Sequence, residues 1–171
     1  MALRRAKQDG PNGRRFQMRQ QMMSIGDDYW IEDEAGAHSF RVNGKAMRAR
    51  DTWVLEDAGG NEVAKIREKK LSIRDAIKIE LAAGGEAVVK KEIVSIRDRF
   101  HVEVEHGEDL TVKGNIVNHE YEIERDGDTI AEISKKWFRV RETYGVEVRD
   151  GADSALVLAV TVAVDALTRS D

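Results

Sequence analysis

Lysine and arginine are the side chains in this sequence whose spacing most clearly indicates chemistry. They recur at similar intervals, as Lys69-Lys70, Lys90-Lys91, Lys135-Lys136, Arg50, Arg74, Arg97 and Arg141. Near an anionic surface each such residue contributes about 1 kcal/mol of attraction. This pattern indicates docking on anionic phospholipid headgroups. A second interpretation stays open: each arginine is followed by an acidic residue, and the charges then serve only as solvated strand charges that limit edge aggregation.

Residues typical of catalysis or metal binding are scarce. The chain has no cysteine, which excludes disulfides, thiolate catalysis and cysteine-ligated metals. The histidines, at positions 38, 101, 106 and 119, lack the helical spacing of a zinc site. The acidic turns lack the spacing of an EF-hand, and no G-x-S-x-G nucleophile motif occurs. We therefore predict a protein that is not an enzyme and has no cofactor or metal.

The elements that position the basic residues come from an internal repeat. Three segments align without gaps: LSIRDAIKIEL (71–81), VSIRDRFHVEV (94–104) and FRVRETYGVEV (138–148). Three further copies are MSIGDDYWIED (23–33), MRARDTWVLED (47–57) and a weaker one around NHEYEIERD (118–126). Each copy ends in an acidic, glycine-containing turn, which is a hairpin signal. Two strands per copy predict a meander of about 12 strands.

Apolar and charged residues alternate on both sides of these turns. Ile77, Ile79 and Leu81 share one face, whereas Lys78 and Glu80 share the other. A period of two is typical of a half-buried antiparallel strand. We also predict a β-bulge at each Lys-Lys pair, and at residues 68–70 the reason is that Ala64 and Ile66 follow one phase and Leu71 and Ile73 the other. The turns then form an acidic end of the sheet, and the basic residues gather at the opposite, basic end.

The segment SALVLAVTVAVDAL (154–167) is the least polar part of the chain. As a helix of about 15 residues it spans roughly 22 Å, less than the roughly 30 Å of a bilayer core. Its valines favour a buried strand, but Asp153 or Ser154 after Gly151 supplies a helix N-cap. An open sheet would leave two edges, and a closed barrel of this size needs a filler. We therefore predict a mainly β protein with no transmembrane segment: a closed antiparallel barrel of about 12 strands around a buried C-terminal helix.

Several segments resemble those of the LURP-one-related family. They are MRQQMMSIGDDYWIEDEAG (18–36), GNIVNHEYEIERDG (114–127), IAEISKKWFRVRETYGVEV (130–148) and DSALVLAVTVAVDAL (153–167). The resemblance covers nearly the whole chain after residue 15 and implies the tubby-like fold, a 12-stranded barrel around a buried C-terminal helix. Its more distant relatives by fold are the tubby proteins, which bind phosphoinositides, and the phospholipid scramblases. It implies no catalytic residue, and we expect a flexible basic leader (1–15) before a single domain (16–171).

Charge and composition narrow the choice of partner. The net charge is −4, so nucleic acid ranks low even though Arg14, Arg15, Phe16 and Arg19 lie close together. We predict a non-catalytic binding module that docks on anionic phospholipid headgroups through its basic end. The alternative is a protein–protein interaction scaffold with no lipid role, and a hydrolase or transferase is a remote third. We expect a cytoplasmic monomer that is peripheral to the membrane.

Overall fold

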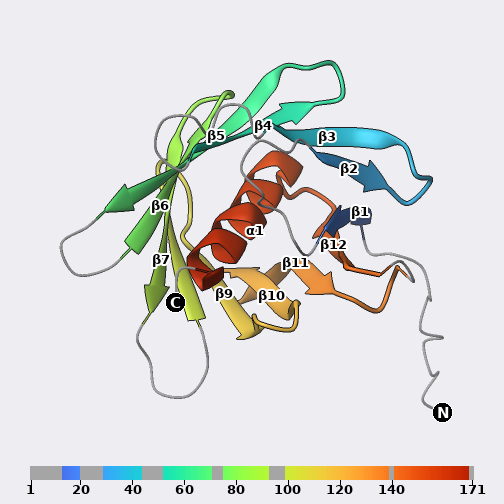
Figure 1. Ribbon diagram of the computed structural model, residues 1–171. Helices are drawn as coiled ribbons and strands as arrows, with labels where there is room; N and C mark the ends of the chain where they lie inside the picture. The colour runs from blue at the N-terminus through green and yellow to red at the C-terminus, as the bar shows by residue number, and fades with distance from the viewer. Residues whose placement is uncertain are drawn as a thin grey trace, which may run out of the picture.

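The computed structural model describes residues 13–19, 29–43, 52–70, 75–92, 99–138 and 141–169. Strands in these ranges form one closed antiparallel barrel in which each strand pairs with its neighbours in sequence (Figure 1). They are β1 (Gly13–Arg19), β2 (Tyr29–Asp33), β3 (His38–Asn43), β4 (Thr52–Asp57), β5 (Glu62–Lys70), β6 (Asp75–Leu81), β7 (Glu86–Glu92), β8 (Arg99–Val104), β9 (Leu110–Asn115), β10 (Glu120–Arg125), β11 (Asp128–Ser134) and β12 (Thr143–Arg149). The predicted barrel and its strand number are confirmed.

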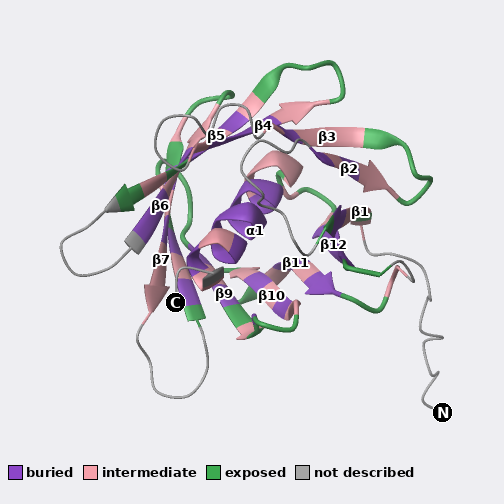
Figure 2. Cartoon of the chain, viewed as in Figure 1, coloured by how far each residue is buried: buried purple, intermediate pink, exposed green. Residues whose placement is uncertain are grey.

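The apolar C-terminal segment forms α1 (Ser154–Arg169), which lies inside the barrel (Figure 1). Asp153 is its N-cap, because Oδ1 of Asp153 accepts a hydrogen bond of 2.9 Å from the backbone nitrogen of Ala155. Residues 157–165 of the helix are all buried, and the middle of α1 is coloured accordingly in Figure 2. The inward side chains of the strands pack around them. Ile77 and Ile79 lie on this inner face as predicted. The helix therefore supplies the core of the barrel, as the sequence indicated.

Asp and Gly build the turns at the acidic end. Oδ1 of Asp57 accepts hydrogen bonds of 2.9 Å from the backbone nitrogens of Gly59 and Asn61. The bond from Asn61 is the main cause that lowers the pKa of the Asp57 carboxyl. Gly60 then adopts a φ of 84°, which a residue with a side chain rarely adopts. Asp33 makes the same pair of backbone bonds in the turn between β2 and β3.

The predicted bulges at residues 68–70 and at Lys90-Lys91 are wrong. The ladder between β7 and β8 runs without a shift through Lys90 opposite His101 and Lys91 opposite Phe100. The ladder between β5 and β6 runs without a shift from Ala64 opposite Leu81 to Lys70 opposite Asp75. Register shifts occur instead near the acidic end, after Ile31, Leu55 and Ile123. The hairpins therefore absorb their extra residues beside the Asp–Gly turns, where strand pairing ends in any case. Leu71 and Ile73, whose phase suggested the bulge, lie outside the described residues.

Within the described ranges, no helix is both long enough and apolar enough to cross a membrane.

Candidate ligand pocket and basic end

The structure places the predicted basic residues on two sides of the barrel. Lys69 and Lys70 end β5, and Lys90 and Lys91 lie near the end of β7. Lys135, Lys136 and Arg141 lie on the connection between β11 and β12, across the barrel from β5. Arg50, Arg74 and Arg97 lie outside the described residues. The described members of the predicted set therefore lie in two separate parts of the barrel.

The described basic residues differ in whether a neighbouring acidic side chain balances their charge. Nζ of Lys90 lies 2.9 Å from Oε1 of Glu103, and both side chains are on the outer face of the barrel. Lys69, Lys135, Lys136 and Arg141 are exposed and make no ion pair with a described residue. The suggested pairing of each arginine with the next acidic residue can be checked at Arg141, which makes no ion pair with Glu142. The connection between β11 and β12 thus carries exposed positive charge without a local partner.

This connection is held against the outer wall by aromatic side chains. The rings of Trp137 and Phe138 lie over Gly145 of β12, so closely that a Cβ on Gly145 would lie 2.7 Å from Cε3 of Trp137. The guanidinium of Arg15 lies 4.7 Å from the centroid of the Trp137 ring, and its Nε donates a 2.8 Å hydrogen bond to Glu147. β12 is therefore buried on both faces. Because Gly145 has no side chain, the rings of Trp137 and Phe138 can pack directly on β12, and this packing positions the connection that carries the exposed basic residues.

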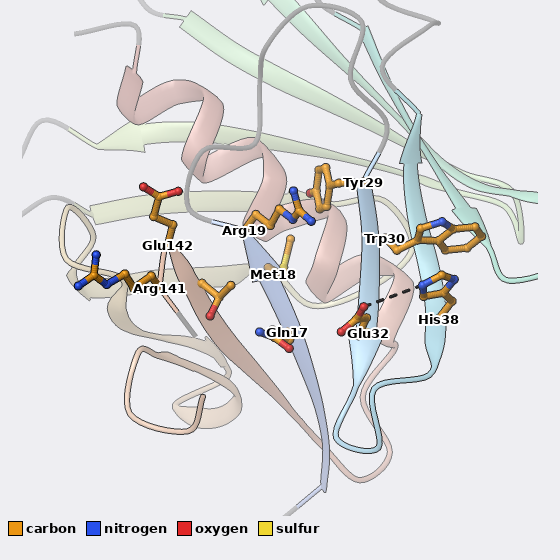
Figure 3. Close-up of a pocket in the computed structure, with 10 residues that line it drawn as sticks. Gln17, Met18, Arg19, Tyr29, Trp30, Glu32, His38, Arg141 and Glu142 are labelled. Carbon is orange, nitrogen blue, oxygen red and sulfur yellow. Dashed lines mark ion pairs between the residues drawn. The ribbon is translucent and has the colours of Figure 1, made fainter. Parts of the chain in front are cut away.

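Next to this connection, the barrel wall opens between β1 and β2. β1 pairs with β12 over all seven of its residues, but with β2 only through Phe16 opposite Asp33 and Gln17 opposite Glu32. A pocket of about 650 Å³ lies where the two strands separate (Figure 3). It is lined by Gln17, Met18, Arg19, Tyr29, Trp30, Glu32, His38, Arg141, Glu142 and Thr143.

Buried apolar and aromatic side chains form the floor of the pocket, on the side of the barrel core, and charged side chains form its walls. Met18 and Tyr29 are buried in the barrel core. On the outer face of β2, the Trp30 ring stacks on the His38 ring with 4.2 Å between centroids. Nε2 of His38 in turn lies 3.9 Å from Oε1 of Glu32. The lining therefore combines an aromatic pair with an acidic side chain on the β2 side.

The opposite side of the pocket is basic. Arg19 extends from β1 into the space between the strands, toward Tyr29 (Figure 3). It makes no ion pair with Glu32 or with any other residue that the structure describes. Arg141 lines the far side of the pocket, and its guanidinium is directed away from Arg19 (Figure 3). Arg19 thus lies where β1 and β2 have separated, whereas Glu32, of opposite charge, lies at the last β1–β2 pair, and both line the pocket.

A buried polar cluster lies in the core next to the pocket. Tyr144, which is opposite Met18 in the β1–β12 ladder, stacks on His119 with 4.3 Å between ring centroids. Asp165 of α1 contacts both residues. Burial, and then the nearby charge of Asp165, raise the pKa of Tyr144 well above its ordinary value. No three His, Asp or Glu side chains among the described residues converge as metal ligands do.

Sequence reasoning missed the pocket. It singled out Arg19 and Arg141, but for other surfaces, and it assigned no role to Trp30, Glu32 or His38 beyond their strands. Spacing gives no signal for this site, because the pocket exists only where the β1–β2 ladder stops after two pairs.

Comparison with known proteins agrees with the fold. A sequence profile of the LURP-one-related family matches residues 14–165. The X-ray structure of a protein from Arabidopsis thaliana superposes with a TM-score of 0.61 and 16% sequence identity, covering 91% of this chain and 92% of that one. At this identity the likeness concerns the fold alone. No curated protein matches the sequence.

Proposed function

Because the chain belongs to the LURP-one-related family, we propose that it is a non-catalytic binding module that docks on anionic phospholipid headgroups through its basic end. The observation that carries this proposal is that Lys135, Lys136 and Arg141 are exposed on one connection and make no ion pair with a residue that the structure describes. The turns at the other end of the barrel are acidic. A molecule with this charge distribution turns its basic end toward an anionic surface.

An exposed apolar side chain lies at the same end. Val117, in the turn between β9 and β10, is 65% exposed and is the only large hydrophobic residue so exposed among those described. Glu120, just after this turn, accepts a 2.8 Å hydrogen bond from the Ser134 hydroxyl and a 3.0 Å bond from the backbone nitrogen of Lys135. The turn is therefore tied to the basic connection. An exposed valine beside lysines suits the interfacial region of a bilayer, where the free energy of burying the apolar side chain adds to the attraction between the lysines and anionic lipids.

The barrel interior is filled by protein side chains, which limits ligand binding to the surface of the molecule. α1 and the inward strand residues fill the space that the wall encloses, so a ligand must bind at an end or on the outer face. Each lysine or arginine near an anionic surface adds about 1 kcal/mol, so the three residues of the connection together provide weak, reversible docking. Such docking is peripheral, weakens with salt, and needs no second copy of the chain.

Vesicle co-sedimentation tests this proposal. The protein should sediment with phosphatidylglycerol or phosphoinositide vesicles at about 50 mM salt and much less at about 300 mM, as screening requires. Lys136→Glu should weaken binding, and the double change Lys135→Glu with Lys136→Glu should abolish it. Arg125→Glu is the matched control, because Arg125 is exposed beside a turn at the acidic end and makes no ion pair within the described part of the chain. Wild-type protein that ignores every anionic vesicle at low salt would contradict lipid docking and favour a protein partner.

A further inference from the structure

The pocket between β1 and β2 has the dimensions of a ligand site. Its volume of about 650 Å³ lies within the range of small-molecule pockets, roughly 300 to 1,000 Å³. It is built on strands of a closed barrel rather than on a terminus: β1 is fixed by seven pairs to β12, and β2 is paired to β3. Each of the two strands is therefore held by its other neighbour in the sheet where it lines the pocket.

The charges in the lining sum to zero but are not neutralised by direct contact. Arg19 and Arg141 are matched in number by Glu32 and Glu142. Among the described residues, Glu32 has only the long contact of 3.9 Å to His38, and Arg19 has no ion pair. A dianion placed beside Arg19 would also face Glu32 across the pocket. The ligand that satisfies both walls is one that carries a positive and a negative group itself.

The position of each group follows from its neighbours. Gln17 and Arg19 alternate with buried residues on β1 and share its outer face, so both offer N–H donors to the pocket; Gln17 is paired with Glu32, whereas Arg19 lies beyond the last β1–β2 pair. A phosphate, with several acceptor oxygens, suits these donors. On the other side, Glu32 lies beside the stacked rings of Trp30 and His38. The guanidinium of Arg41 already lies 5.6 Å from the centroid of the Trp30 ring, so the carboxylate of Glu32 is the main partner that this wall offers to an ammonium group.

We propose that this pocket binds a small zwitterion whose phosphate contacts Arg19 and whose ammonium group contacts Glu32 and the Trp30–His38 pair. The ligand class is an alkylammonium phosphate, which exists both as the free compound and as a zwitterionic lipid headgroup. This site goes beyond docking on anionic vesicles, because it requires no negative surface and does not involve Lys135 or Lys136.

Nuclear magnetic resonance titration on the full chain provides the test. The indole N–H signal of Trp30, assigned with Trp30→Phe, is followed as phosphoethanolamine or phosphocholine is added. The two halves of the ligand are the comparison: glycerol 2-phosphate carries only the anion, and choline carries only the cation. Because a hydrogen bond to a charged group contributes about 1.5 to 3 kcal/mol, each half should bind at least roughly tenfold more weakly than the zwitterion.

Variants separate the two walls of the site. Arg19→Gln should weaken phosphoethanolamine binding by about tenfold or more and leave choline binding unchanged, whereas Glu32→Gln should weaken both. Arg125→Gln, at the acidic end, should change neither. Circular dichroism and thermal unfolding show whether each variant is folded. A folded wild type whose Trp30 signal does not move, or moves equally with glycerol 2-phosphate, would overturn the proposal.

Neutral vesicles then identify the source of the ligand. If the protein binds phosphatidylcholine or phosphatidylethanolamine vesicles and Arg19→Gln abolishes that binding, the ligand is a lipid headgroup. Binding of the soluble compounds alone identifies it as a free zwitterion. The Lys135→Glu, Lys136→Glu double variant tests the pocket independently of the basic end. It should lose anionic vesicles and retain phosphoethanolamine, so failure of one proposal does not hide the outcome of the other.

Discussion

The hydroxyl group of Tyr144 on β12 donates a hydrogen bond of 2.7 Å to Oδ2 of Asp165 on α1. Both residues are buried, and the other carboxylate oxygen of Asp165 lies 3.4 Å from Nε2 of His119. A buried carboxylate is costly unless such partners compensate for lost water. Asp165 is the one acidic residue in the helix. Its contacts can form only when α1 sits at one depth and one rotation within the otherwise apolar barrel interior, so they favour that position over others.

Removing this hydrogen bond should destabilise the fold. Tyr144→Phe leaves a buried carboxylate oxygen without its donor, and we expect the free energy of unfolding to fall by about 1 to 3 kcal/mol in urea titrations. Tyr121→Phe is the matched control. The Tyr121 hydroxyl is buried and makes no hydrogen bond with a described residue, and the nearby Thr161 hydroxyl donates to the carbonyl of Val157 instead. Equal losses in the two variants would contradict the role given to Asp165.

The same cluster predicts sensitivity to alkaline pH. Burial first, and the charge of Asp165 second, raise the pKa values of Tyr121 and Tyr144 well above 10. Above about pH 10 the unfolded chain releases these protons while the folded chain keeps them, so stability falls by about 1.4 kcal/mol per pH unit for each tyrosine. Below that pH both states keep the protons, and these tyrosines cause no pH dependence. Ultraviolet absorbance of tyrosinate should therefore rise together with loss of the circular dichroism signal. Ionisation of both residues near pH 10 in a folded protein would count against this prediction.

The barrel was predictable from sequence because its determinants are local. The alternation around Ile77 and Ile79 and the glycine-containing turns, such as the one at Asp57, each lie within a few residues and recur along the repeat. The polar interruption at Asp165 was visible, but its partners His119 and Tyr144 come together only through the barrel closure. The pocket depends likewise on where one ladder ends, which no period in the sequence records.

The helix should be indispensable for folding. Val160 is fully buried at the centre of α1, so Val160→Asp places an unpaired charge in the core and should cost several kcal/mol. A chain that ends at Gly151 loses the filler entirely and should not fold cooperatively. Ala155→Asp is the control, because Ala155 is half-buried in the first helical turn, where a negative charge is favourable. Thermal unfolding followed by circular dichroism distinguishes the three. A cooperative transition in the truncated chain would refute the filler role of α1.

Gly145 should couple the stability of the barrel to the position of the basic connection. A side chain there meets the rings of Trp137 at 2.7 Å and Phe138 at 2.9 Å, and both rings are tied to the connection that carries Lys135, Lys136 and Arg141. Gly145→Val should therefore cost about 1 to 3 kcal/mol, as overpacking does elsewhere. If the clash with Trp137 is the cause, adding Trp137→Ala should recover part of the loss, so that the two changes are not additive in a double-mutant cycle. Urea titration of the four proteins measures this coupling. Additive losses would mean that Trp137 does not pack on Gly145 in solution, and the connection would then need another anchor on the barrel wall.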